Sequence, residues 1–141
     1  MSWRYILPPV VAWFIAQVFK VAFESMRERR LDLRILASMG GMPSSHSAMV
    51  MALTAAVARI DGVGSATFSI ALMFSLVVMY DAAGVRRAVG RQAAILNRIV
   101  DDVLTQRQGI REERLRELLG HTPVQVLAGA ALGILVGLAW P

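Results

Sequence analysis

The sequence predicts an all-α integral membrane protein: a bundle of about four transmembrane helices, with a cytoplasmic amphipathic helix between the third and the fourth. Of the 141 residues, 56% are hydrophobic and only 18% are charged, which is too apolar for a soluble domain of this size. The apolar residues fall into four segments, residues 5–23, 48–60, 65–80 and 124–140. Since no repeat or linker divides the chain, we expect a single membrane-embedded domain over residues 1–141.

The four apolar segments differ in length. The first and the last are close to the roughly 20 residues that a helix needs to cross a bilayer. The first has no signal-peptide cleavage pattern and contains Lys20 near its end, so we interpret it as a retained helix. The third needs residues 81–85 to reach full length, and the second is short enough for either a span or a re-entrant helix.

A stretch of mixed polarity joins the third and fourth segments. Val89, Ala93 and Leu96 recur there at helical spacing, with charged residues between them. This pattern predicts an amphipathic helix that lies along the membrane surface or folds beneath the bundle. A second short helix is expected over residues 111–119, ended by Gly120.

Basic residues determine the expected orientation. Eight arginines lie between residues 86 and 116, and four more follow the first segment, whereas the other side holds only Arg4 and Arg59. The positive-inside rule then places both arginine-rich loops in the cytoplasm and both termini outside. The predicted location is the bacterial inner membrane, with the candidate site facing the cytoplasm.

Composition also limits the partners. The net charge of +5 is spread between apolar segments and is not gathered with aromatic residues in one patch, so anionic lipid head groups are favoured over nucleic acid. The chain contains no cysteine, which excludes disulfides and thiolate metal sites.

The most informative stretch is Gly-Gly-Met-Pro-Ser-Ser-His-Ser, residues 40–47. The glycines and the proline break any helix, and Ser44 and Ser45 then stand at the start of the next one. A helix start presents free backbone N–H groups and suits an anion. His46 lies in the first turn, where it can protonate a leaving oxygen or bind a phosphate. The alternative is a capped helix with an interfacial histidine.

The other histidine, His121, opens the fourth segment. The predicted topology brings it to the same membrane face as His46. A neutral imidazole there can act as a nucleophile toward phosphorus while its partner acts as general acid. A purely structural role is the alternative.

Lys20 and Arg27 are seven residues apart and lie on roughly the same face of the first helix. Ionisable groups in membrane helices are costly, which makes both candidates for ligand binding. The alternatives are that Lys20 extends to the interface, as long basic side chains do, and that Arg27 acts only as a topology signal.

Asp81 ends the third segment, shortly before Arg86 and Arg87. Its carboxylate can orient a catalytic histidine, or it can pair with one of these arginines to neutralise a buried charge. The residues alone leave both interpretations open.

Gly129, Gly133 and Gly137 repeat every four residues along the fourth segment. Such a stripe allows another helix to approach closely, either within the bundle or across a dimer. A homodimer would help four short spans to enclose a site.

Three stretches, residues 40–48, 80–87 and 118–123, resemble the divergent type 2 phosphatidic acid phosphatase family, which is related to acid phosphatases and vanadium-dependent haloperoxidases. The resemblance covers nearly the whole chain. It implies a helical membrane fold and a metal-independent phosphatase that needs no cofactor.

The main superfamily has a lysine and an arginine separated by six residues and followed by proline, and then Pro-Ser-Gly-His. Lys20 and Arg27 resemble the first pair, although Glu28 stands in place of the proline. Ser44 and His46 resemble the second motif, with a serine where glycine is usual.

The third motif of the superfamily is incomplete here. His121 is similar to the nucleophilic histidine, but Gln125 stands in place of the aspartate and Leu115 in place of an arginine. The residues that could replace the missing cation are Arg86, Arg87, Arg114 and Arg116, and Asp81 could replace the missing acid.

The resemblance implies that His121 attacks phosphorus to form a phosphohistidine while His46 protonates the leaving alkoxide. Substrate phosphate would be held by Lys20, Arg27, Ser44, Ser45, Arg86 and Arg87. The expected function is hydrolysis of a phosphomonoester or pyrophosphate of a phosphatidyl or prenyl lipid. The alternative is a non-catalytic protein that binds anionic lipid or serves as a membrane scaffold, and a transporter subunit is a third hypothesis.

Overall fold

The computed structural model describes residues 3–28, 41–104 and 121–141, and within them all side chains except those of residues 27–28, 85–87 and 100–104. Every element in these ranges is an α-helix, which confirms the predicted all-α class. The helices are α1 (Trp3–Glu28), α2 (Ser45–Ile60), α3 (Ala66–Ala83), α4 (Val85–Leu104) and α5 (Pro123–Ala139).

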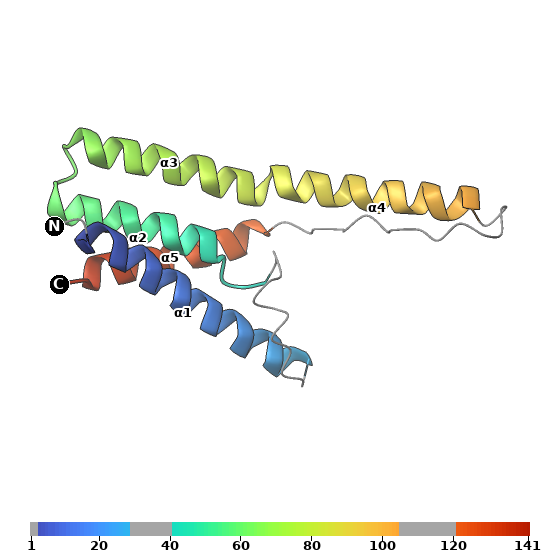
Figure 1. Cartoon of the computed structure of the whole chain (residues 1–141), viewed down its shortest axis with the longest axis horizontal. Helices are drawn as coiled ribbons and strands as arrows, with labels where there is room; N and C mark the ends of the chain where they lie inside the picture. The colour runs from blue at the N-terminus through green and yellow to red at the C-terminus, as the bar shows by residue number, and fades with distance from the viewer. Residues whose placement is uncertain (1–2, 29–40, 105–120) are drawn as a thin grey trace.

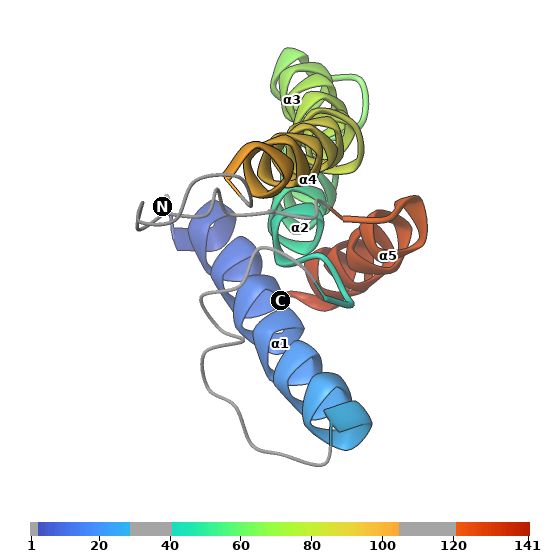
Figure 2. The ribbon, with the colours of Figure 1, turned by 90° about the vertical axis from the view of Figure 1, so that its right-hand side faces the viewer.

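Helix α2 forms the centre of the bundle. It packs against α1, α3 and α5, which surround it in Figures 1 and 2. Its buried residues are mostly small, among them Ala48, Ala52 and Ala56. The segment with the fewest apolar residues is therefore the one that its neighbours cover most fully.

The glycine stripe of α5 packs against α2. A Cβ atom built on Gly133 would lie 2.2 Å from the Ala48 carbonyl oxygen, and one on Gly129 would lie 2.2 Å from the Ser44 oxygen. A Cβ on Gly137 would lie 2.6 Å from the Ala52 oxygen. Of the two uses predicted for this stripe, the structure shows the one within the chain. The homodimer remains a prediction.

Helix α1 packs through one narrow face. Four of its buried residues, Pro8, Ala12, Ala16 and Lys20, follow one another at intervals of four, so that they lie along one side of the helix. Large residues such as Phe14 and Phe19 are exposed on other faces. Lys20 therefore continues the packed face of the helix, and only 3% of its surface is exposed.

A pair of hydroxyl groups links α2 to α3. The Oγ atoms of Thr54 and Ser75 are 2.7 Å apart, and both residues are buried. Each hydroxyl also lies within hydrogen-bonding distance of the Val50 and Ala71 carbonyl oxygens. Such bonds hold helices together where water is absent.

Two stretches of helix are long and apolar enough to cross a membrane, Trp3–Met26 and Ala66–Ile99. Helices α2 and α5 are apolar but shorter. The second stretch joins α3 to part of α4, and its 34 residues would measure about 50 Å, more than the roughly 30 Å of a hydrocarbon core.

Helix α4 is the predicted amphipathic helix, but its direction differs from the prediction. It continues roughly along α3 past the end of the bundle (Figure 1), and among the described helices it contacts α3 alone. The reason lies at Gly84, whose N–H donates to the Tyr80 oxygen and whose oxygen accepts the Ala88 N–H. Gly84 is thus the single residue between the two helices, and it makes a helical hydrogen bond on each side. The helix expected over residues 111–119 lies outside the described residues.

Candidate functional site

The starts of α2 and α5 meet at one end of the bundle, beside the end of α3 (Figure 1). Two backbone hydrogen bonds join these segments. The Ser44 N–H donates to the Gln125 oxygen at 3.0 Å, and the His121 N–H donates to the Ala82 oxygen at 3.2 Å. Residues far apart in the sequence are thus fixed side by side through the main chain.

Ser44 is the N-cap of α2 and is completely buried. Its Oγ accepts the Ser47 N–H at 3.4 Å and the Ser47 hydroxyl at 3.1 Å. Because its own N–H is bonded to Gln125, Ser44 has no amide to offer an anion. The Ser45 N–H, in contrast, makes no hydrogen bond to any described residue, so it is the better anion donor of the two predicted serines.

His121 lies immediately before α5 and is 4% exposed. Thr122 and Gln125 form a capping box behind it: Thr122 N–H donates to Gln125 Oε1 at 3.0 Å, and Gln125 N–H donates to Thr122 Oγ1 at 3.4 Å. His121 Nδ1 lies 3.3 Å from the same Gln125 Oε1. The cap that starts α5 therefore also holds the imidazole.

This network assigns the tautomer of His121. A backbone N–H can only donate, so the Gln125 atom that receives the Thr122 N–H must be the amide oxygen. That oxygen can only accept, so a hydrogen bond between the two groups requires the hydrogen on Nδ1 of His121. In a neutral ring with this tautomer, the lone pair is on Nε2, the nitrogen turned away from Gln125.

Gly41 covers the Lys20 side chain. Its φ of +93° belongs to the left-handed region that favours glycine. A Cβ atom at this position would lie 3.0 Å from Lys20 Cε. The backbone of Gly41 also hydrogen-bonds to His121. This one glycine thus touches both the lysine from α1 and the histidine before α5.

The pKa of His121 is lowered from its ordinary value of 6.5, mainly because the ring is buried. Charges on Lys20 and His46 lower the pKa further, whereas the hydrogen bonds to Gln125 and the Gly41 backbone oppose the shift. His121 is therefore a neutral imidazole at pH 7. Its electrostatic coupling to Lys20 and His46 brings residues from three segments into one cluster.

A model of the divergent PAP2 family matches residues 1–136 of this chain. The chain belongs to the divergent PAP2 family. It is also 38% identical over 143 residues, covering 94% of this chain and 90% of the relative, to the uncharacterized membrane protein YuiD of Bacillus subtilis (strain 168). The name of this relative and the apolar helices together identify a membrane protein. The search of solved structures finds no match.

The divergent PAP2 assignment confirms the resemblance drawn from the sequence, and the structure can be compared with the residues it implied. Those brought together are Lys20, Ser44, Ser45, His46 and His121. Asp81 is half-buried at the end of α3, next to the residue that accepts the His121 N–H. The side chains of Arg27, Arg86 and Arg87, and all of Arg114 and Arg116, lie outside the described residues.

Two members of the cluster were not predicted as site residues. In the sequence, Gln125 is only a departure from the superfamily pattern, but in the structure it hydrogen-bonds to the imidazole. The sequence Thr-Pro-Val-Gln, residues 122–125, carries the signature of a capping box and could have indicated its position. In the sequence, Gly41 indicates only that a helix is broken there. Its contacts with Lys20 and His121 have no signal in the sequence.

Proposed function

We propose that this protein is a lipid phosphate phosphatase of the inner membrane that hydrolyses a phosphomonoester or pyrophosphate of a phosphatidyl or prenyl lipid at the cytoplasmic face. In this proposal α1, α2, α3 and α5 cross the bilayer, and the basic loops face the cytoplasm as the positive-inside rule requires. The observation that supports it most is the cluster of Lys20, His46 and neutral His121 at the bundle end that carries these loops.

The reaction begins with attack by His121 Nε2 on phosphorus. The new N–P bond forms as the P–O bond to the lipid breaks, and His46 donates a proton to the departing alkoxide. Lys20 and the Ser45 N–H stabilise negative charge on the non-bridging oxygens. Water, deprotonated by His46, then attacks the phosphohistidine to release phosphate and restore His121.

Other predicted residues have supporting roles in this proposal. Arg27, Arg86 and Arg87 supply further positive charge for the phosphate, in place of the arginine missing from the third motif. Asp81 is the carboxylate closest in sequence to the Ala82 contact with His121.

Gln125 fills the orienting position that an aspartate occupies in the main superfamily. In this proposal its amide oxygen accepts a hydrogen bond from Nδ1–H of His121, which leaves the lone pair on Nε2. Being neutral, it stabilises the protonated ring less than a carboxylate does. The His121 imidazole should therefore be less basic than one oriented by a carboxylate, and it should stay neutral, and able to attack phosphorus, at a lower pH.

Replacing Gln125 with leucine is expected to lower kcat roughly tenfold, the kinetic equivalent of about one neutral hydrogen bond. Lipid phosphate binding should persist, because Gln125 does not contact the phosphate in the proposed mechanism. Gln125→Glu is the matched control: it keeps an acceptor at Nδ1 and should raise the pKa of His121. Steady-state kinetics with a short-chain lipid phosphate measure kcat for both variants. Unchanged kcat in Gln125→Leu would show that the side chain does not position His121.

The acid limb of kcat/KM should lie below pH 6.5. His121 must be neutral to attack, and its pKa is lowered from 6.5 by burial and by the charges of Lys20 and His46. Activity should thus be retained as the pH falls to 6.5 and be lost only at lower pH, and the limb should move upward in Gln125→Glu. A wild-type limb above pH 6.5 controlled by His121 would contradict this assignment.

The proposal is tested by assaying phosphate release from a panel of lipid phosphates with purified protein. The panel should include phosphatidic acid, a prenyl phosphate and a prenyl pyrophosphate, each with and without a chelator. Chelator-resistant release from at least one of them is expected. Saturable binding without release from any of them would instead favour the non-catalytic alternative.

A further inference from the structure

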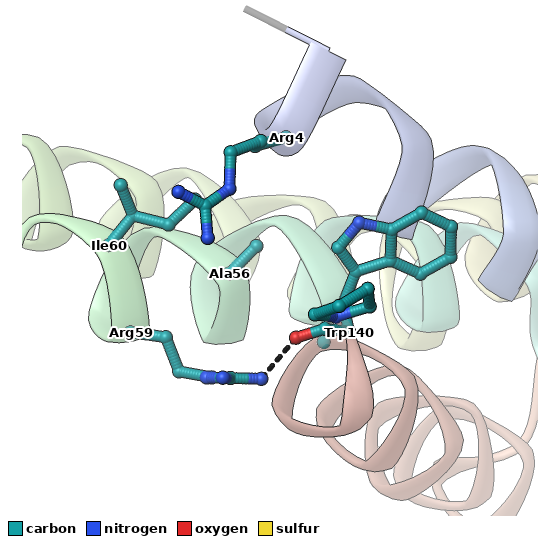
Figure 3. A pocket seen from close by; sticks show the side chains of 7 residues that line it. Arg4, Ala56, Arg59, Ile60 and Trp140 are labelled. Atoms are coloured by element: carbon teal, nitrogen blue, oxygen red, sulfur yellow. Dashed lines mark hydrogen bonds between the residues drawn. The ribbon is translucent and has the colours of Figure 1, made fainter. Parts of the chain in front are cut away.

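A basic pocket (Figure 3) lies at the end of the bundle opposite to the histidine cluster, where α1 begins and α2 and α5 end (Figure 1). Its volume is about 180 Å³, and its lining includes Arg4 from α1, Arg59 from α2 and Trp140 at the end of α5. Three helices therefore contribute to it, as they do to the histidine cluster. The proposed catalytic mechanism uses none of its residues.

Arg59 is fixed in place by the end of α5. Its Nη1 donates to the Leu138 oxygen at 2.5 Å and also to the Trp140 oxygen, the bond drawn in Figure 3. These are carbonyl oxygens at a helix C-terminus, which attract cations. Arg59 thereby covers the acceptors that would repel an anion. Its other guanidinium nitrogens form no hydrogen bond with the described residues.

Two further donors face the same pocket. The Arg4 guanidinium extends from α1 toward α2 in Figure 3, and it forms no hydrogen bond or ion pair with any described residue. The indole nitrogen of Trp140 is buried without a hydrogen-bond partner, and it lies on the side of the ring nearer Arg4. An indole N–H can only donate. The pocket thus combines two positive charges with a buried donor.

Asp61 is the acidic residue near this end of the bundle, and its carboxylate is already hydrogen-bonded. Asp61 accepts hydrogen bonds from the Tyr5 hydroxyl at 2.6 Å and from the Thr67 hydroxyl at 2.7 Å. Both bonds lower the pKa of Asp61, and its side chain does not line the pocket. Asp61 therefore does not neutralise Arg4 or Arg59.

We infer that this pocket binds a phosphate group, and that at this depth the phosphate is that of a phospholipid head. Arginine is the preferred partner of phosphate because its planar fork donates two parallel hydrogen bonds. Trp3, Tyr5 and Trp140 lie at this end of the bundle, where tryptophan and tyrosine mark the head-group level of a bilayer. A bound phosphate would join α1 to α2 and α5 at the end opposite to the histidines.

The test uses the full chain, purified in a maltoside detergent, with native mass spectrometry and thermal unfolding as readouts. Phosphatidylglycerol is the lipid probe, since it is a phosphodiester and not a phosphomonoester. A diacyl glycolipid with the same chains lacks the phosphate, and inorganic phosphate lacks the chains. Arg4→Gln tests the pocket, and Arg98→Gln, an exposed arginine on α4, is the matched control.

Phosphatidylglycerol is expected to bind and raise the Tm, and Arg4→Gln should weaken this binding about tenfold, as loss of one charge-assisted contact predicts. Arg98→Gln should bind phosphatidylglycerol as the wild type does. The glycolipid should leave the Tm of the wild type at its value without lipid. If inorganic phosphate gives the same Arg4-dependent stabilisation, the pocket binds phosphate, but the ligand is the free ion and not a phospholipid head group. Equal phosphatidylglycerol binding by wild type and Arg4→Gln would overturn the inference.

Discussion

Replacing His121 with alanine is expected to abolish phosphate release, with kcat lower by at least about 10³-fold. The substitution removes the only atom of the protein that forms a bond to phosphorus in the proposed mechanism, and the remaining cluster can stabilise charge but cannot replace it. Substrate binding should change little, because Lys20 and the start of α2 are retained. Release assays and lipid phosphate binding, measured on the same preparation, separate these effects. Persistent release by His121→Ala would show that another group is the nucleophile.

The His46 substitution distinguishes the two histidines. As general acid, His46 should contribute roughly 10²–10⁴-fold for a lipid alkoxide, which needs a proton to leave. An aryl ester with a nitrophenolate leaving group needs none, so in His46→Ala the formation of the phosphohistidine, followed as the first-turnover burst of nitrophenolate, should stay far faster than with the lipid. Hydrolysis of the phosphohistidine, for which His46 is the base, should slow equally with both substrates. His121→Ala should be inactive toward both substrates. Equal losses in the first-turnover rate on both substrates in His46→Ala would contradict its role as acid.

The control substitution for these assays should not be made at Arg59. By the positive-inside rule Arg59 is a basic residue on the outer side, far from the site, but it hydrogen-bonds to the carbonyl groups at the end of α5. Its loss would loosen the helix that begins next to His121. Arg98, exposed on α4, is the better choice.

Adding one methyl group at Gly133 is expected to destabilise the bundle by about 3 kcal/mol, at the upper end of the range for overpacked cores. The Cβ of Gly133→Ala would lie 2.2 Å from the Ala48 oxygen and 2.9 Å from the Ala52 nitrogen. Both atoms belong to the backbone of α2 and cannot rotate away, so α5 must move. Thermal unfolding in detergent measures the loss.

Gly64→Ala is the matched control, because a Cβ there meets nothing within 4 Å. Its Tm should stay close to that of the wild type. Gly133→Ala should also lose phosphatase activity, since displacement of α5 separates Gln125 from Ser44. Equal Tm values for Gly133→Ala and wild type would show that α2 and α5 are not packed as described.

Much of the fold could be predicted because helix periodicity and apolar length are local properties of the sequence. The four apolar segments correspond to α1, α2, α3 and α5 with small changes at their ends. The glycine stripe correctly indicated a close helix contact. Its partner could not be predicted, because a stripe of small residues describes one surface and not the surface that meets it.

The site was predictable to the extent that its residues are chemically unusual. Lys20, His46 and His121 stand out as ionisable groups at the ends of apolar segments, and topology alone brings such ends together. Gln125 and Gly41 are not unusual in that sense. Their roles depend on a side-chain rotamer and on one backbone conformation, which only the structure describes.

The path of α4 was also not predictable in detail. The amphipathic pattern was expected to lie along the membrane surface or beneath the bundle, but Gly84 makes helical hydrogen bonds to both α3 and α4. A glycine permits a change of direction without requiring one, and the pattern of the sequence does not show which occurs.

The most direct test of the account is to trap the covalent intermediate. The protein is mixed with a lipid carrying a ³²P-labelled terminal phosphate, quenched at alkaline pH within the first turnovers, digested, and mapped by mass spectrometry. We expect the label on a histidine, in the peptide that contains His121. A label on His46 or on another residue, or complete turnover without a labelled enzyme at any time point, would contradict the proposal that His121 is the nucleophile of a shared histidine cluster.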